Sequence, residues 1–178
     1  MIDGGYAHHI QKVGPWIDFL KFSNKICQDT ERIRTYYYTC YPYQSNPPTD
    51  EEKSTYSKTD KFIKKLISYP RFEVKLGKLQ KIDGVYRQKG VDVMLSIDLV
   101  TMSRGGKIDK AIIIAGDSDF VYAVQAAKDA GIITELYYSD KLGINNDLLQ
   151  VFDETKIIDD KLISECKKIL RVDSTTQT

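Results

Sequence analysis

Ala111-Ile-Ile-Ile-Ala-Gly-Asp-Ser-Asp-Phe120 is the stretch of sequence that decides the fold. Its first five residues form a short apolar run that ends at Gly116, which is typical of a buried parallel strand. From Phe120 onward, apolar residues recur at helical spacing, and Gly131 stands where a helix commonly ends. A buried strand followed directly by a helix is the repeating unit of an α/β fold.

The same alternation extends over the rest of the chain. Further strands are predicted from β-branched and aromatic residues at 1–3, 33–39, 72–76, 132–138 and 151–157. Amphipathic helices are predicted from apolar residues recurring within 16–27, 62–67 and 162–170. This pattern predicts a three-layer α/β/α sandwich with a mainly parallel sheet.

Two segments between the strands have patterns of their own. Residues 79–86 are expected to form a short extension or a hairpin with Asp83-Gly84 at its turn. Residues 91–102 are apolar nearly all round, which predicts a helix that is buried on all sides.

The length of 178 residues indicates a single domain, expected over residues 1–172, with a polar tail at 173–178. The composition, 42% hydrophobic and 29% charged, is that of an ordinary globular protein. The net charge of +1 identifies no partner, because a basic rim around an acidic pit would cancel in the total.

Cysteine usage and hydropathy bound the cellular setting. The three cysteines are odd in number and show no C-x-x-C spacing, which argues against a disulfide framework and against a zinc site. No apolar run approaches the roughly 20 residues that cross a membrane, and the N-terminus lacks the apolar region of a signal peptide. We therefore expect a cytoplasmic protein with no membrane partner.

Four aspartates stand where functional groups of open parallel sheets gather. Asp3 ends the first strand before Gly4-Gly5, which we expect to let the backbone turn tightly, and Asp117 and Asp119 follow the strand at 111–115. Asp92 opens the apolar helix, so its carboxylate is expected to face the same edge.

Carboxylates that converge at one edge repel one another. Each close pair costs about 1 kcal/mol in water and about 4 kcal/mol at a partly buried site. Mg²⁺ or Mn²⁺, which prefer oxygen ligands, would remove this repulsion. Such an ion supports phosphodiester hydrolysis without a protein nucleophile, because it activates water and neutralises phosphate charge.

Each aspartate taken alone also has a structural explanation. Asp117 or Ser118 would cap the helix that follows, Asp92 would be favoured by the helix dipole, and Asp3 would form a turn. Their joint occurrence favours a metal site. Asp98 lies six residues after Asp92, hence about 120° around the helix, and is either an outer carboxylate of that site or the partner of a buried base.

Other polar and aromatic residues are candidates for substrate binding. Lys89 would hold a phosphate or orient a carboxylate near Asp92, with surface solvation as the alternative, and Ser118 lies between the paired aspartates. A basic rim is expected from Arg87, Arg104 and Lys107, with scattered surface bases as the alternative. Base stacking is expected from the loop residues Tyr41 and Tyr43, with an ordinary surface role as the alternative. The neighbouring His8 and His9 are expected mainly to be a solvated helix entry, with substrate contact as the weaker alternative.

Three blocks of sequence resemble the signature of a known family. Met1-Ile-Asp-Gly-Gly-Tyr6, Gln88-Lys-Gly-Val-Asp-Val93 and Gly116-Asp-Ser-Asp-Phe120 occur in the order and spacing of the NYN domain family, in its LabA-like (DUF88) branch of the PIN-like nucleases. The resemblance implies a PIN-like, Rossmann-like fold and a Mg²⁺- or Mn²⁺-dependent site that cleaves RNA. The family's acidic residues match Asp3, Asp92, Asp117 and Asp119.

Two positions depart from the pattern of that family. Many relatives carry Asn where this chain has Tyr6, and only Met1 and Ile2 precede Asp3. Either the first strand is very short or the sequence shown lacks its beginning.

Taken together, residues and resemblance predict a metal-dependent ribonuclease acting on single-stranded RNA, with DNA as a further possible substrate. The alternative is a catalytically silent RNA-binding or adaptor module with the same fold. A phosphotransfer domain would need a second acidic residue beside Asp3, and a dinucleotide-binding fold would need G-x-G-x-x-G after the first strand; neither is present. The mode of cleavage and the oligomeric state stay open.

Overall fold

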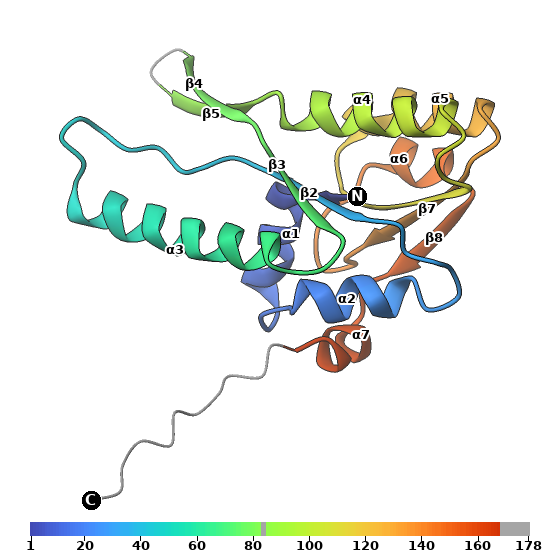
Figure 1. Ribbon diagram of the computed structural model, residues 1–178, viewed down its shortest axis with the longest axis horizontal. Helices are drawn as coiled ribbons and strands as arrows, with labels where there is room; N and C mark the ends of the chain where they lie inside the picture. The colour runs from blue at the N-terminus through green and yellow to red at the C-terminus, as the bar shows by residue number, and fades with distance from the viewer. Residues whose placement is uncertain (83–84, 168–178) are drawn as a thin grey trace, which may run out of the picture.

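The computed structural model describes residues 1–82 and 85–167. Six parallel strands form one sheet in the order β3-β2-β1-β6-β7-β8 (Figure 1). Their bounds are β1 (Ile2–Asp3), β2 (Thr35–Thr39), β3 (Phe72–Leu76), β6 (Lys110–Ile114), β7 (Ile133–Tyr138) and β8 (Glu154–Ile157). The predicted α/β sandwich with a parallel sheet is confirmed.

Helices cover both faces of this sheet (Figure 1). One face carries α4 (Val91–Arg104), α5 (Val121–Asp129) and α6 (Asn146–Val151), of which α6 was not predicted. The other carries α1 (Gly4–Val13), α2 (Phe19–Ile26), α3 (Asp50–Ile67) and α7 (Asp160–Glu165). None of the helices in the described ranges is long and apolar enough to cross a membrane.

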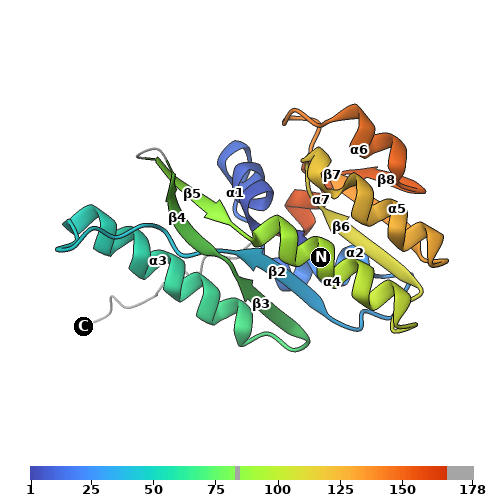
Figure 2. The same cartoon turned by 90° about the horizontal axis from the view of Figure 1, so that it is seen from above.

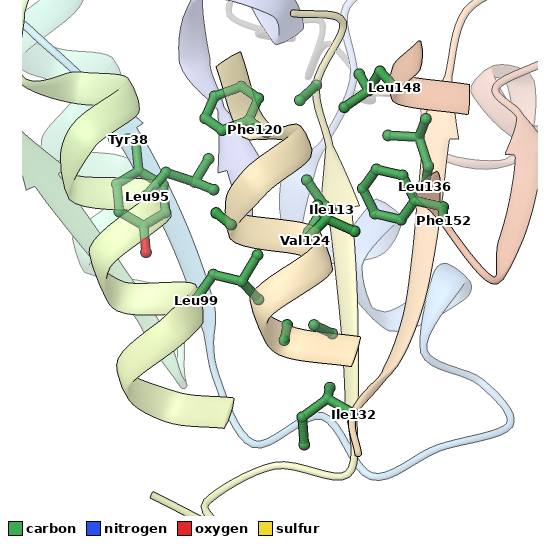
Figure 3. Packing of buried hydrophobic residues seen from close by; sticks show 14 of the residues in the cluster. Tyr38, Leu95, Leu99, Ile113, Phe120, Val124, Ile132, Leu136, Leu148 and Phe152 are labelled. Atoms are coloured by element: carbon green, nitrogen blue, oxygen red, sulfur yellow. The ribbon is translucent and has the colours of Figure 1, made fainter. Parts of the chain in front are cut away.

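The sheet separates two apolar cores. Successive side chains of a strand point to opposite faces, so Tyr38 packs with α4 and α5 while Tyr37 packs with α1 and α2. Figure 3 shows the first core, in which Leu95 and Leu99 of α4 face Tyr38, and Val124 of α5 lies over the sheet. Tyr37 and Tyr38 are therefore both buried, on opposite faces of the sheet.

Strand order reverses at β1, which lies between β2 and β6. Ile2 pairs with Tyr37 on one side and with Ile114 on the other. In the given sequence β1 comprises two residues, and the Met1 amine donates a hydrogen bond of 2.6 Å to the Ile112 carbonyl. Residues that follow β1 and β6 meet at the carboxyl edge of the sheet, where open α/β sheets bind their ligands.

The chain leaves the sheet between β3 and α4 as an antiparallel hairpin. β4 (Lys78–Ile82) pairs with β5 (Val85–Lys89), and Ile82 lies opposite Val85. The hairpin is thus confirmed, whereas its expected turn residues Asp83 and Gly84 lie outside the described residues. Both views show it projecting from the body at the end where the first half of α3 also projects (Figures 1 and 2).

Helix α4 differs from the expectation of a helix buried on all sides. Leu95 and Leu99 are fully buried, but Val93 and Ile97 on the opposite side are 59% and 58% exposed. The helix belongs to an outer layer, so the sheet covers only one of its faces. An apolar residue pattern cannot reveal which face is left uncovered.

Helix α5 ends as the sequence predicts. Gly131 has a φ of 84°, and its N–H donates to the Lys128 carbonyl while that of Ile132 donates to the Ala127 carbonyl. These two bonds satisfy carbonyls at the helix end, and glycine adopts the left-handed conformation at no steric cost.

The exposed and buried faces of α4 generate a paired prediction. Leu99→Ala should lower the free energy of unfolding by about 2–5 kcal/mol, because it opens a cavity in a closed core. Ile97→Ala, two residues away on the uncovered face, should change it by no more than about 0.5 kcal/mol. Urea denaturation of both variants measures this difference, and equal losses would contradict the one-sided burial of α4.

Candidate functional site

An open pocket of about 570 Å³ lies at the carboxyl edge of the sheet, where β1 and β6 end. Four segments line it: the start of α1, the start of α4, the turn after β6 and the loop after β7. The lining residues are Asp3, Gly5, Tyr6, His9, Asp92, Gly116, Asp117, Ser118, Leu142, Gly143 and Asn145.

Three carboxylates of this pocket stand at the amino ends of helices. Asp3 caps α1, and its Oδ1 accepts a hydrogen bond of 2.9 Å from the Gly5 N–H. Asp117 caps the short 3₁₀ helix Ser118–Phe120, and its Oδ1 accepts one of 3.1 Å from the Asp119 N–H. Asp92 lies in the first turn of α4. Asp3 and Asp117 therefore cap helices and line the pocket at the same time. The positive ends of the helix dipoles favour the negative charge of the carboxylates.

Two glycines allow the elements around the pocket to approach closely. A Cβ on Gly4 would lie 2.5 Å from the Tyr38 carbonyl oxygen, and one on Gly116 would lie 2.4 Å from Cε2 of Tyr6. Gly4 thus serves close packing of α1 on β2 and starts the helix, instead of forming the separate tight turn that was expected. Tyr6 also accepts a buried hydrogen bond of 3.0 Å from the Ser139 N–H, so it links α1 to the end of β7.

The carboxylates sense one another's charge. Burial raises the pKa of the Asp3 carboxyl to about 6; the charges of Asp92 and Asp117 add to the rise, and the hydrogen bond from Gly5 opposes it. Burial also raises the pKa of Asp92, together with the charges of Asp117 and Asp119. Folding therefore makes the ionised forms of Asp3 and Asp92 less favourable than they are in water.

The predicted acidic residues do not all occupy the pocket. Asp119 does not line it, although its charge reaches Asp92. Asp98 lies elsewhere on α4: it accepts a hydrogen bond of 3.0 Å from the Tyr38 hydroxyl, and its Oδ2 lies 3.8 Å from Nζ of Lys75. Its position in mid-helix over β2 and β3 gives it these partners.

Two residues of the predicted basic rim do not lie at this edge, whereas the third, Arg87, belongs to β5, which leads into α4. Arg104 and Lys107 follow the far end of α4, and Arg104 comes twelve residues after Asp92, which along a helix is about 18 Å. Ser118 lines the pocket, and Lys89 lies three residues before Asp92 at the end of β5.

The loop tyrosines are engaged with the protein. The ring of Tyr41 stacks on that of Tyr56 with centroids 4.8 Å apart, and its hydroxyl donates to Asp60 at 3.1 Å. Tyr43 in the same loop is half-buried and also has an interaction within the protein. One face of the Tyr41 ring is thus covered by α3.

The structure adds pocket residues that sequence reasoning missed or ranked low. His9 lines the pocket one helical turn after Gly5, and this spacing of four residues was available as a signal. Tyr6 and Asn145 also line it. The position of Asn145, which follows β7, depends on how distant segments pack and could not be read from a local pattern.

The donor set of the pocket suits a hard divalent cation. Carboxylate oxygens are the ligands that Mg²⁺ and Mn²⁺ prefer, and the pKa values of Asp3 and Asp92 are raised by burial and further by neighbouring carboxylates, whose charge a cation would compensate. Within the described ranges no three Asp, Glu, His or Cys side chains form a group that could hold a metal ion.

The Asp3 carboxyl generates a prediction on stability against pH without metal. Its folded pKa of about 6 exceeds the ordinary 3.8, so the folded state binds more protons between these values and stability falls as pH rises from about 4 to 6. A pKa that is about two higher in the folded state corresponds to about 3 kcal/mol in the free energy of unfolding. Asp3→Asn keeps a side-chain oxygen for the helix cap and should remove the fall in stability that the Asp3 carboxyl causes. Urea denaturation across pH 4–7 in the presence of chelator measures the free energy of unfolding of both proteins. Parallel pH curves for the two proteins would contradict it.

Comparison with known proteins agrees with this architecture. A protein of unknown function, VPA0982 from Vibrio parahaemolyticus, has a crystal structure similar to this chain, with a TM-score of 0.66 at 18% identity over 89% of this chain and 90% of that one. None of the curated proteins matches the sequence. The profile of the NYN domain, typically a nuclease domain of the PIN-like group, matches residues 1–160. The chain therefore belongs to the NYN domain family.

Proposed function

We propose that this protein is a metal-dependent ribonuclease that hydrolyses phosphodiester bonds in single-stranded RNA. The observation that carries the proposal is the placement of Asp3, Asp92 and Asp117 around one open pocket at the edge where strand order reverses. Membership of a family of nucleases supports the reaction class. The three motif blocks that contain these residues also support a place in the LabA-like (DUF88) branch.

The carboxylates would hold Mg²⁺ or Mn²⁺ in this pocket, some of them directly and the rest through waters. When bound, the ion would lower the pKa of a water molecule and neutralise negative charge on the phosphate. Asp119 lies outside the pocket and would act through its charge on Asp92. The helix caps keep Asp3 and Asp117 in fixed orientations, so little ordering is needed when the ion binds.

The pocket also contains neutral hydrogen-bonding groups, which suit the substrate. His9, Ser118 and Asn145 line it together with the acidic residues. Imidazole, amide and hydroxyl groups donate hydrogen bonds to phosphate oxygens without adding negative charge. A phosphodiester group would therefore lie between the ion and these donors, with its nucleotides running out of the open mouth of the pocket.

One observation favours a second candidate function, an RNA-binding or adaptor module that does not cleave. No three carboxylates among the described residues are placed to hold one ion together. A module of this kind would keep the pocket and bind RNA through its neutral hydrogen-bonding side chains. The two functions differ in whether a divalent ion changes the RNA.

Replacing Asp117 by Asn separates these functions. Wild-type protein should cleave single-stranded RNA with Mn²⁺ or Mg²⁺ and stop when a chelator is added. Asp117→Asn should be folded but at least 100-fold less active, an order of magnitude set by the loss of a charged oxygen ligand, since an outer partner alone costs about 10–100-fold. Gel analysis of labelled RNA measures this. Asp29→Asn, an exposed aspartate remote from the pocket, is the matched control and should stay active.

Intact RNA under every metal condition, from protein freed of contaminating nucleases, would establish the adaptor instead. Activity that survives chelation, or an Asp117→Asn variant as active as the control, would contradict the metal site.

Metal binding should also be visible without substrate. An ion that binds only the folded state stabilises it by RT ln(1 + [ion]/Kd), about 2.7 kcal/mol at 100 times Kd. The melting temperature of the wild type should therefore rise with Mn²⁺, and that of Asp117→Asn should rise much less. Equal shifts in both proteins would place the ion elsewhere.

A further inference from the structure

Two lysines lie directly opposite each other at the base of the β4–β5 hairpin. Lys78 of β4 pairs with Lys89 of β5, and both side chains are exposed. Residues opposite each other in an antiparallel pair have Cβ atoms about 4.5–5.5 Å apart on the same face, and like charges in this position are destabilising. The opposed lysines therefore lower the stability of the hairpin, unless an anion lies between them.

The rest of the chain pairs many of its lysines with carboxylates. Lys110 lies 2.7 Å from Glu135 and 2.9 Å from Glu154, and Lys128 lies 3.1 Å from Asp153. Within the parts of the chain that the structure describes, neither Lys78 nor Lys89 has a carboxylate partner. Two opposed ammonium groups without a counter-charge are suited to an external anion.

A hollow beside this pair gives such an anion room. It has a volume of about 380 Å³ and is lined by Leu76, Gly77, Lys78, Leu79, Lys89, Gly90 and Met94. A Cβ on Gly77 would lie 2.6 Å from Cγ2 of Val91, so the hairpin base is held tightly against the start of α4. Apart from the two lysines, the lining has no charged side chain, which leaves the anion without a competing carboxylate.

This hollow adjoins the acidic pocket along the chain. Lys89 ends β5, Gly90 turns the backbone with a φ of 84°, and Asp92 lies in the first turn of α4 with its carboxylate in the pocket. Three residues span at most about 11 Å. Figure 2 shows β5 running into the amino end of α4, so the lysine pair lies at the entrance of that helix.

We propose that Lys78 and Lys89 form a phosphate-binding clamp for the nucleic-acid backbone that runs on from the acidic pocket. The pair neutralises a phosphate neighbouring the one bound in the acidic pocket. This assignment rests on the proposed function for its ligand, because a chain of regularly spaced phosphates is what links the two hollows. It also explains why two lysines lie opposite each other, since a phosphate bound between them attracts both ammonium groups.

A double variant tests the clamp on binding alone. In the Asp117→Asn protein, RNA stays intact, so the affinity for a labelled single-stranded RNA can be measured by fluorescence anisotropy over a range of salt. Adding Lys78→Met and Lys89→Met should weaken binding several-fold and lower the salt slope by about 0.7, the value for one lost phosphate contact on a single strand. Thermal unfolding of the same protein should be unchanged or slightly higher, because the like-charge pair is gone.

The matched control removes the same charge at the other end of α4. Arg104→Met with Lys107→Met lowers the net charge equally and should leave affinity and salt slope unaltered. Lys78→Arg with Lys89→Arg should keep binding, because the charges remain. Unchanged affinity in the Lys78/Lys89 variant, or an equal loss in the control, would overturn the clamp.

A length series separates this inference from the proposed function. In the active protein the double variant should slow cleavage of long RNA more than cleavage of an oligonucleotide too short to reach the hairpin. If the wild type neither binds nor cleaves RNA, the proposed function fails. If the wild type cleaves RNA and the Lys78/Lys89 variant cleaves RNA of every length at the same rate as the wild type, only the clamp proposal fails.

Discussion

The structure depends on a central strand of two residues. Ile2 and Asp3 pair with β2 on one side, Ile2 also pairs with β6 on the other, and strand order reverses around them. The chain continues from β1 into α1 on one face of the sheet and from β6 toward α5 on the other face, and the pocket lies at the sheet edge where β1 and β6 end. Gly4 and Gly116 allow this crowded point to close, since a Cβ at either position would clash with a neighbouring strand or with Tyr6. The acidic pocket is thus a consequence of how the middle of the sheet is built.

The pocket balances two opposed electrostatic effects. Burial and mutual repulsion raise the pKa values of Asp3 and Asp92. Helix amino ends favour the same carboxylates, and backbone N–H groups fix the orientations of Asp3 and Asp117. A carboxylate group that is oriented but incompletely compensated has a built-in preference for a cation. The uncompensated carboxylates lower the free energy of unfolding, and a cation that binds only the folded state would raise it again.

Charge is divided in space in a way the total of +1 conceals. Carboxylates and neutral donors line the pocket together, and the lysine pair of the hairpin lies just before the start of α4. The bases at the far end of α4, which the sequence had suggested as a rim, are separated from this edge by the length of the helix. The hairpin, by contrast, directly precedes the helix that carries Asp92.

Local patterns determined much of this protein. The strand at 111–115, the glycine stop of α5, the hairpin and the alternation of Tyr37 and Tyr38 follow from side-chain size, backbone freedom and the period of a strand, which act between near neighbours in the chain. The same patterns placed Asp3 and Asp117 at strand ends. Tertiary structure alone decided what depends on distant contacts. It left one face of α4 uncovered, gave Asp98 to Tyr38 and Lys75, engaged Tyr41 with α3, and brought His9 and Asn145 to the acidic pocket. These outcomes depend on which surfaces the sheet brings together, and no run of neighbouring residues encodes that.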